Sequence, residues 1–600
     1  MSSLLSVPPA LIVALALSLV PLVSRKLAHA VATVALSAVV AWAFLVPDGT
    51  GSTVTFIGFE LIVVNVDSFS RLMAIIFGAF GASAVAFAYF ADASKRHLLW
   101  GLGYVTASLW TVMVGDWLGL IAGWEAMAIA STIFVWLSGG DAIRAGYRYA
   151  LAHALGGSIL LAGLLVHLAA VGVSPTALHF DGTGISGLEI GLAGVQFSLA
   201  ALLAGIGIGI NAAIIGFHSW LPDTYPRPHV ATSVFLACYT TKTAVYAAYR
   251  AFPDGNLALA YMGGAMAIYG AAFALAQKDM RRLLSYHIQG QVGFMLVGIG
   301  VGSSLGIAGA FAHLFNHILY KGLLFMAAGI IIIKLGKESL DKYGAVGTSA
   351  PIALGAFLVG ALSISGVPLF NGFVSKGLLK EAVVAQELGI LEWMLVLGSV
   401  GTFASFIKFG YYAFLYGDPI EMPDADLGHT VVAGSVAASC IALGVFYQPL
   451  FAILPFADQW SLDPYTTGKM FDTATFAIGG LVVFVAGKPL FDRMHGGIDV
   501  NRAHDPLAFY GTRSLSGGLG RLYNGVDRRV VATGWTLVAV AQNPAPVIRS
   551  RLPDSLHERY DNRLSAIPGK TGAKLGISPT IYVATGVLLV VLGLALGVQP

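Results

Sequence analysis

Charge and cysteine are both scarce in this chain of 600 residues. Asp, Glu, Lys and Arg together make up 11% of it, against about 25% in soluble domains. Its two cysteines, Cys238 and Cys440, both lie in apolar segments and indicate neither a disulfide framework nor a metal cluster. The net charge of +3 says little about partners, and we expect no nucleic-acid partner.

Apolar residues take the place of the missing charge. They make up 57% of the sequence, and its mean hydropathy is +0.78. Runs of about 18 or more mostly apolar residues recur along the whole chain, each long enough to cross a bilayer as a helix. The sequence therefore predicts an all-α polytopic membrane protein with about sixteen transmembrane helices. The expected segments lie near 8–24, 28–46, 69–92, 98–115, 117–138, 146–172, 192–216, 230–250, 257–277, 284–303, 305–333, 350–375, 391–416, 430–455, 472–487 and 578–597.

The order of the loops predicts the orientation. Basic residues gather in alternate loops, whereas the intervening loops carry Asp48, Asp181, Glu189 and Asp254, with Arg250 as the main exception. Because basic loops stay in the cytoplasm, the N-terminus is expected outside, and an even helix count places the C-terminus outside as well. The first apolar segment has no charged region before it, so we interpret it as a spanning helix and not as a cleaved signal.

Residues 490–575 differ from the rest, since they mix Arg, Asp, Gly and Pro with short apolar stretches. A helix is not expected to continue through the NPAP sequence at 543–546. We expect cytoplasmic or lateral amphipathic pieces along the membrane surface or another subunit, followed by a last transmembrane helix in 576–600. The alternative is a loosely ordered cytoplasmic linker.

Two ionisable residues lie inside apolar segments of the first half. Lys242 stands about ten residues before Arg250 and so near mid-bilayer, and Glu125 lies about eight residues into its segment. A charge at that depth costs roughly 2.5–3.5 kcal/mol on insertion scales, so such residues usually have a function. The alternative for Glu125 is a carboxylate satisfied by a neighbouring helix for packing alone.

The segment AHLFNHILYKGLLF contains His313, His317 and Lys321 at positions i, i+4 and i+8. This spacing places all three on one helical face and predicts a protonatable file accessible to water. Zinc binding is the rival interpretation of the histidine pair, but no Glu or Cys accompanies it and the next position is a lysine. No metal and no cofactor are expected.

Lys376 lies in GVPLFNGFVSKGLLKEAVV, where Gly366, Pro368 and Gly372 predict a broken helix. Interrupted helices at membrane depth expose backbone groups that hold water or ions, and they line transport paths. The alternative is that Lys376 and Lys380 extend to the interface.

Five motifs follow one another along the chain: HSWLPDTYPRP, TKTAVYAAYR, ALAQKDMRRLLSYHIQGQVGFM, HLFNHILYKGLLFMAAG and GVPLFNGFVSK. In their order and spacing the sequence resembles the antiporter-like subunits shared by Mrp-type Na+/H+ antiporters, respiratory complex I and membrane-bound hydrogenases. The resemblance covers about residues 60–420, and the LPDTYP sequence is most similar to the D-type subunit of Mrp antiporters.

The resemblance implies two inverted repeats of five helices, each with one broken helix, at 98–250 and 251–416. Residues 1–97 and 417–489 would hold the additional transmembrane helices. The resemblance also implies a proton relay in which Glu125 pairs with a lysine, Lys242 follows, and a central group leads to the lysine of the second broken helix. The relay residues would be Glu125, Lys242, His313, His317, Lys321 and Lys376.

The first broken helix departs from the family pattern. Most relatives have a lysine seven residues before the histidine of the WLP motif, His218, and here that position is Asn211. An amide does not titrate, so no lysine can release a proton there. Asn211, His218 and Asp223 are candidates to contact water or an ion, and the alternative is a first half that no longer conducts.

The resemblance implies a proton-translocating subunit of a multi-subunit cation/proton antiporter in a prokaryotic cell membrane. Its partners would be the other subunits, H+, Na+ and the lipid bilayer. Three alternatives remain: a pump module of a complex I-like or hydrogenase complex, a structural subunit without transport, and a polytopic membrane enzyme. The enzyme alternative predicts catalytic clusters in long external loops, whereas these loops are short.

Overall fold

The computed structural model describes residues 7–49, 51–192, 195–340, 345–347, 349–493, 501–542 and 549–565. The chain divides into two units, Met1–Asp499 and Val500–Pro600.

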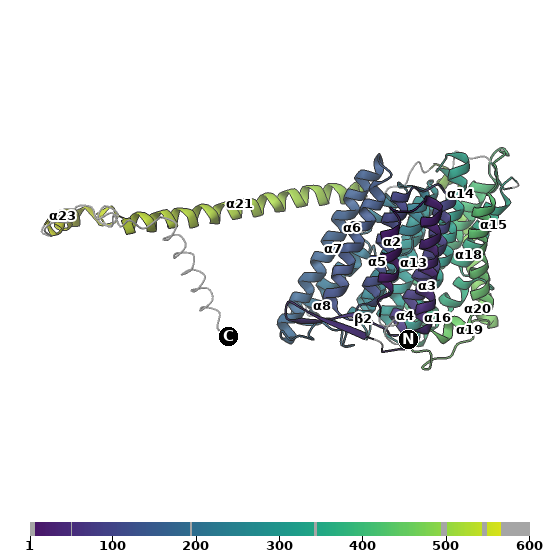
Figure 1. The fold of residues 1–600 in the computed structure, drawn as a ribbon, viewed down its shortest axis with the longest axis horizontal. Coiled ribbons are helices and arrows are strands. Elements are labelled where there is room, and N and C mark those ends of the chain that lie inside the picture. The colour runs from purple at the N-terminus through teal and green to yellow at the C-terminus, as the bar shows by residue number, and fades with distance from the viewer. Residues whose placement is uncertain are drawn as a thin grey trace. The chain divides into compact units, whose positions relative to one another are not determined.

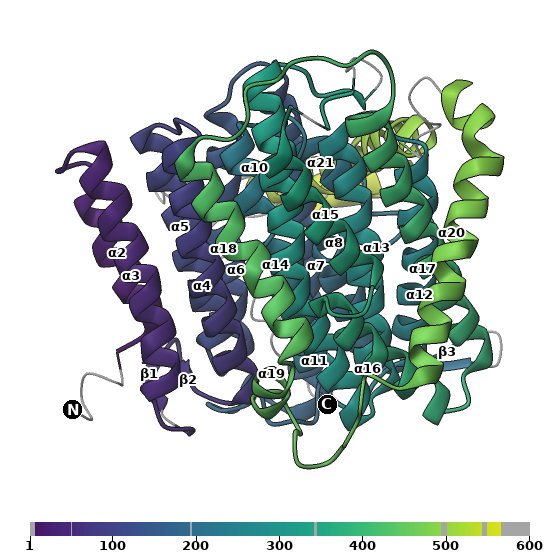
Figure 2. The same cartoon turned by 90° about the vertical axis from the view of Figure 1, so that its right-hand side faces the viewer.

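The first unit is a bundle of helices that run side by side (Figure 1). The N-terminal helices α2 and α3 lie at one edge and α20 at the other (Figure 2). The helices before the middle of the chain are α2 (Pro9–Leu19), α3 (Arg25–Leu45), α4 (Ser68–Phe90), α5 (Lys95–Met113), α6 (Trp117–Trp136), α7 (Asp141–Val171), α8 (Leu199–Asn211), α9 (Trp220–Thr224), α10 (Val230–Leu236) and α11 (Thr240–Ala251). They are followed by α12 (Leu257–Leu275), α13 (Met280–Val301), α14 (Ser304–Leu335), α15 (Pro351–Ser365), α16 (Asn371–Ala385), α17 (Gly389–Gly410), the π-helix η2 (Tyr411–Leu415), α18 (Leu427–Val445), α19 (Gln448–Ala452) and α20. Helix α20 spans Thr467–Arg493.

The predicted polytopic membrane fold is confirmed. Within the described residues, nine helices are long and apolar enough to cross a membrane, and three shorter apolar helices accompany them. Each of the first fifteen expected segments overlaps a helix, and the sixteenth, 578–597, lies outside the described residues. Polar side chains fix where several helices begin; Asp67 and Ser70, for instance, form a reciprocal capping box at the start of α4.

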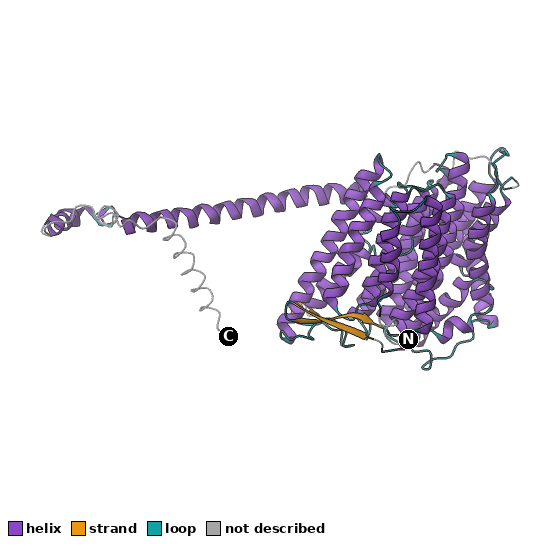
Figure 3. Ribbon diagram, in the orientation of Figure 1, coloured by secondary structure: helices purple, strands orange, loops and turns teal. Residues whose placement is uncertain are grey.

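Two β-hairpins are an addition that the all-α prediction did not include. Strand β1 (Gly51–Phe56) pairs antiparallel with β2 (Phe59–Asn65), and β3 (Glu189–Leu192) pairs with β4 (Val195–Ser198). Both hairpins lie at one end of the bundle (Figure 3). The Asp116 carboxylate accepts a 2.7 Å hydrogen bond from the backbone N–H of Ile62, which joins β2 to the start of α6.

The two expected helix breaks are present and have the same backbone pattern. After α8, Ala213 and Gly216 have φ values of +59° and +95°. After α15, Gly366 and Leu369 have φ values of +81° and +75°, again three residues apart. Left-handed residues cannot continue a right-handed helix, so each pair ends one helix and redirects the chain into the next. This matching geometry supports the expected internal repeat.

A third break was not expected. The segment near 230–250 was predicted as one span, but α10 ends at Leu236 and α11 begins at Thr240. The reason lies in the side chains that replace the lost helical hydrogen bonds: the Tyr104 hydroxyl accepts from the backbone N–H of Thr240 at 2.9 Å, and Lys242 donates to the Ala237 carbonyl oxygen at 2.6 Å.

Helix α14 forms the centre of the first unit. All its residues from Gly306 to Ile331 are buried, and it packs against α4, α10, α13, α15, α16 and α18. Polar residues on α14 are therefore shielded from lipid by other helices.

The second unit contains α21 (Asn501–Gln542), the 3-10 turn η3 (Asp554–Leu556) and α23 (His557–Ser565). Helix α21 is described as far as Gln542, and the NPAP sequence at 543–546 lies outside the described residues, so the expected end of a helix there stays a prediction. Over Asn501–Gln542 the loosely ordered alternative is wrong, because these residues form one continuous helix. The position of this unit along a membrane surface stays a prediction.

Candidate functional site

Four of the six predicted relay residues have no exposed surface. Lys242 lies on α11, and His313, His317 and Lys321 lie on α14. The ammonium nitrogen of Lys376, on α16, is also buried, although the residue as a whole is only partly so. The structure thus places the basic relay residues inside the bundle.

Lys242 lies at the unexpected break between α10 and α11. Its Nζ donates to the Ala237 carbonyl oxygen at 2.6 Å and to the Thr241 hydroxyl at 3.1 Å. A cation at the carboxyl end of α10 is favourable because helix carbonyl groups carry partial negative charge there. Helix α10 packs against α14, and the Cys238 thiol at the break approaches the Ile318 carbonyl oxygen at 4.0 Å, so Lys242 lies close to where the first half of the chain meets α14.

The three residues of α14 have different surroundings. The two histidine rings are 6.4 Å apart, and Lys321 Nζ lies 5.8 Å from the centre of the Phe406 ring. Both ring nitrogens of His317 lack a hydrogen-bond partner among the described residues, and so does the Lys321 ammonium group. In the part of the chain that the structure describes, no group of three potential metal ligands comes together, so the zinc interpretation gains no support.

Lys376 lies just after the second break. Its Nζ is 4.9 Å from the centre of the Phe294 ring and has no hydrogen-bond partner within the described residues. A cavity beside it is also lined by Lys380, Asp472 and Lys469. Since Lys380 and Asp472 form a 2.6 Å ion pair that is partly exposed, this cavity leads from the buried Lys376 toward charged groups near the surface.

Sequence reasoning missed the polar groups that hold the α14 histidines. His313 contacts Ser375 Oγ through Nδ1 and Gln291 Oε1 through Nε2, both at 3.0 Å. Sequence reasoning also missed His287, a buried residue of α13. The centre of its ring lies 4.7 Å from that of Phe406, and Lys321 faces the same Phe406 ring. The available signal was that the stretch Tyr286–Gln291 holds four polar side chains, Tyr286, His287, Gln289 and Gln291, in the middle of a helix whose second half is apolar.

Glu125 does not pair directly with Lys242. The described residues contain no ion pair between them, and Lys242 bonds to the backbone and a threonine instead. Glu125 is partly buried on α6 and points at α7, where a Cβ placed on Gly157 would lie 2.0 Å from Glu125 Oε1. Trp124, the residue before Glu125, donates to the Oγ1 of Thr243, the residue after Lys242, at 2.9 Å. Helices α6 and α11 therefore contact each other next to these two charged residues.

Asn211, the residue at the position of the family lysine, is buried at the end of α8. It is hydrogen-bonded to His153 on α7, which sequence reasoning also missed. Two further side-chain contacts secure this first break: Gln289 donates to the Ala213 carbonyl oxygen at 3.1 Å, and Trp220 donates to that of Ile210 at 2.9 Å.

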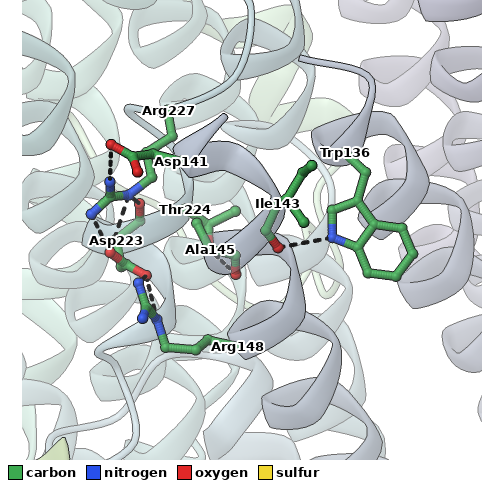
Figure 4. Close-up of polar contacts among 8 residues, drawn as sticks. All are labelled: Trp136, Asp141, Ile143, Ala145, Arg148, Asp223, Thr224 and Arg227. Atoms are coloured by element: carbon green, nitrogen blue, oxygen red, sulfur yellow. Dashed lines mark hydrogen bonds and ion pairs between the residues drawn. The ribbon is translucent and has the colours of Figure 1, made fainter. Parts of the chain in front are cut away.

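The other two candidate contact residues are held by the protein. His218 Nε2 lies 2.9 Å from the Tyr269 hydroxyl. The Asp223 carboxylate binds two guanidinium groups, with Arg148 on one oxygen and Arg227 on the other, and Arg227 also approaches Asp141 at 3.6 Å (Figure 4). This arrangement joins the start of α7 to α9 and favours a structural contribution of Asp223.

Comparison with known proteins agrees with this geometry. Residues 114–405 match the family model described as the transmembrane segment of NADH:quinone oxidoreductase and Mrp antiporters. This segment contains every predicted relay residue and both helix breaks.

Individual relatives come from several kinds of complex. The chain is 27% identical to the D-type subunit of the Na+/H+ antiporter of Alkalihalophilus pseudofirmus, over 67% of this chain and 84% of that protein. It is 29% identical to the N-type subunit of NADH-quinone oxidoreductase of Desulforudis audaxviator, where the match covers 44% of this chain and 58% of the relative. It is 34% identical to hydrogenase-4 component B of Escherichia coli over 39% of this chain and 37% of that protein.

Solved structures show the same fold. A chain of the Mrp complex from Dietzia sp. superposes with a TM-score of 0.67 at 20% identity and covers 81% of this chain and 99% of that one. A chain of respiratory complex I from Thermus thermophilus gives a TM-score of 0.66 at 20% identity, with coverage of 80% and 99%. Residues 114–405 thus match the transmembrane segment of the NADH:quinone oxidoreductase/Mrp antiporter family, and the chain resembles the antiporter-like subunits of Mrp antiporters and complex I.

Proposed function

We propose that this chain is a proton-translocating subunit of a multi-subunit Na+/H+ antiporter. Protons would move in the membrane plane through Glu125, Lys242, His317, Lys321, His313 and Lys376. The first repeat, 98–250, and the second, 251–416, would each form one half of this path.

The observation that carries the proposal is the pair of buried ammonium groups of Lys321 and Lys376. Neither has a hydrogen-bond partner among the described residues, and each faces an aromatic ring at 5.8 or 4.9 Å. A buried charge without a partner is costly, so a structural requirement alone does not explain two of them. Groups that gain and lose protons during a cycle do explain them, because such lysines must not be fixed by a strong partner.

Electrostatic coupling supplies the means of transfer. Unit charges a few ångströms apart in a protein interior interact by several kcal/mol, so the arrival of charge at one residue favours proton release by the next. The membrane potential contributes about 2.3 kcal/mol per charge per 100 mV, which is large enough to drive such a relay in either direction. The packing of α10 against α14 beside Lys242 would couple the two halves.

The partners would be the other subunits of the complex, H+, Na+ and the lipid bilayer. This follows the Na+/H+ antiporter relatives, one of which matches over 84% of its length. We further propose a prokaryotic cell membrane as the location, with basic loops in the cytoplasm and both termini outside.

The alternative is a proton-pumping subunit of a complex I-like or hydrogenase complex, and the identity of 34% to hydrogenase-4 component B favours it. The buried relay serves both functions equally. A non-conducting structural subunit is the third possibility, and its support is Asn211 in place of a lysine.

The test is Na+-dependent proton movement in everted vesicles that contain the whole complex. Lys376→Ala and Glu125→Ala are compared with the parent and with Lys26→Ala, which removes an exposed lysine in the first turn of α3. Loss of movement in both relay variants, with assembly intact, supports one continuous relay. If proton movement is lost with Lys376→Ala but not with Glu125→Ala, only the second half conducts. If neither variant changes proton movement, the proposal is wrong and the chain is a structural subunit. Movement that requires an electron donor instead of Na+ supports the redox-driven alternative.

A further inference from the structure

His153 is a buried, titratable residue for which the proposed relay has no role. It lies on α7 with 3% of its surface exposed. Its position is 12 residues from the start of a 31-residue helix, or about 18 Å along the axis at 1.5 Å per residue. His153 therefore lies deep within the bundle, at a level comparable with Glu125.

The hydrogen bond to Asn211 fixes how the imidazole holds its proton. His153 Nδ1 contacts Asn211 Oδ1, and an amide oxygen only accepts hydrogen bonds. Nδ1 therefore carries the hydrogen, which leaves Nε2 of the neutral ring with a free lone pair. Nε2 is buried and has no hydrogen-bond partner among the described residues. The ring thus has one nitrogen anchored to Asn211 and one available to accept a proton.

The surroundings of His153 place it between Glu125 and polar groups of α11. Glu125 contacts Gly157, which lies one helical turn after His153 on the same face of α7. Tyr149 lies one turn before His153, with the ring centres 4.1 Å apart. The Tyr149 hydroxyl is 3.1 Å from Thr240 Oγ1, and Thr241, the next residue, accepts a hydrogen bond from Lys242.

Other groups around the ring do not compete for the proton. On α9, Trp220 packs edge-on at 4.6 Å, but its N–H is bound to the Ile210 carbonyl oxygen. Toward the start of α7, Arg148 is paired with Asp223, which also binds Arg227. Glu125 is thus the charged group that His153 can exchange a proton with along this face of α7.

We infer that His153 is the proton-carrying residue of the first half, acting beside Asn211 at the level where Glu125 meets α7. This inference rests on the proposed function and extends it to a residue outside the predicted relay. In each cycle the neutral ring accepts one proton at Nε2 to become an imidazolium, and then releases that proton from Nε2 toward Lys242. The Nδ1–H bond to Asn211 persists throughout, so the ring keeps its orientation and its tautomer.

The test is a pair of variants in everted vesicles that contain the whole complex. His153→Asn leaves an amide on both sides of the contact and removes the titratable group, so Na+-dependent proton movement is expected to fall to the background level. The double variant His153→Asn with Asn211→His exchanges the two side chains and returns an imidazole to the same place. Movement is expected to recover in it, at least in part.

The matched control is His167→Asn on the same helix. His167 is 7% exposed and its Nδ1 lies 2.7 Å from the Ser186 carbonyl oxygen, so its loss removes an equally buried histidine away from Glu125. Proton movement in this variant is expected to equal that of the parent. Assembly of every variant is checked by co-purification of the other subunits, and His153→Lys replaces the exchange variant if that one does not assemble.

Two results would overturn the inference. One is normal proton movement with His153→Asn. The other is loss that neither the exchange variant nor His153→Lys repairs in an assembled complex, since that pattern means that the ring serves packing. Lys376→Ala in the same vesicles distinguishes failure of this inference from failure of the proposed function. If Lys376→Ala abolishes proton movement while His153→Asn does not, only the inference about His153 fails. If Lys376→Ala has no effect, the proposed function itself fails.

Discussion

Lys242 donates a 2.6 Å hydrogen bond to the carbonyl oxygen of Ala237, immediately after helix α10 ends. The lysine is fully buried, and the carbonyl is one that a continuous helix would have paired with its own backbone. A single ammonium group therefore stabilises the break between α10 and α11 and takes part in the predicted relay.

Lys242→Met tests this double contribution. Methionine keeps most of the side-chain volume but leaves the Ala237 carbonyl oxygen without its donor, which costs about 1–3 kcal/mol for a buried group. The complex is expected to unfold at a lower temperature, and Na+-dependent proton movement is expected to be lost. A Lys242→Met complex that assembles and still moves protons at the parental rate would exclude Lys242 from the relay.

Gly157→Ala tests the position of Glu125 without removing any titratable group. The added Cβ would lie 2.0 Å from Glu125 Oε1, so the carboxylate must move away from α7. Proton movement is expected to decrease although every relay residue is present. The control is Gly355→Ala on α15, where nothing lies within 4 Å of the new Cβ. Equal rates in the two variants would show that Glu125 does not depend on its contact with α7.

Much of the fold was predictable because membrane helices are encoded by local composition. Apolar runs located the helices, and Gly366, Pro368 and Gly372 located the second break. The break after Leu236 was not predictable, because residues 230–250 contain neither proline nor glycine and the break depends on Tyr104, 136 positions away from Thr240. The two β-hairpins were also not predicted, because two short strands within a loop give only a weak alternation of polar and apolar residues.

The candidate site was predictable only where one helix carries it. His313, His317 and Lys321 share a face of α14, so their spacing alone brings them together. His153 and Asn211 are 58 positions apart and lie on different helices. A lone histidine in an apolar segment is more often a core residue than a proton carrier, so only the tertiary contact distinguishes His153.

Asn316 and Asn371 offer a test of the second break. The Asn316 amide donates to the Asn371 carbonyl oxygen at 2.9 Å, and the Asn371 amide donates to that of Asn316 at 3.4 Å. Each alanine substitution removes one buried hydrogen bond and is expected to destabilise the complex by about 0.5–1.5 kcal/mol. Since each residue donates to the other, the double variant should differ from the sum of the single ones by about 0.5 kcal/mol or more in thermal unfolding. Strict additivity would show that the two bonds act independently.

Asp223 tests whether the charged cluster in Figure 4 is structural. Its carboxylate has 9% of its side-chain surface exposed and binds both Arg148 and Arg227. In Asp223→Asn the two partly exposed guanidinium groups lose their common counter-charge, so the complex is expected to lose about 1.5–3 kcal/mol of stability, the range for hydrogen bonds to charged groups. Asp141→Asn is the matched control, because Asp141 is 82% exposed and 3.6 Å from Arg227; exposed pairs contribute about 0–1 kcal/mol.

Complexes that carry Asp223→Asn and still assemble should move protons at the parental rate. A variant that is as stable as the parent but has lost proton movement would instead place Asp223 in the ion path.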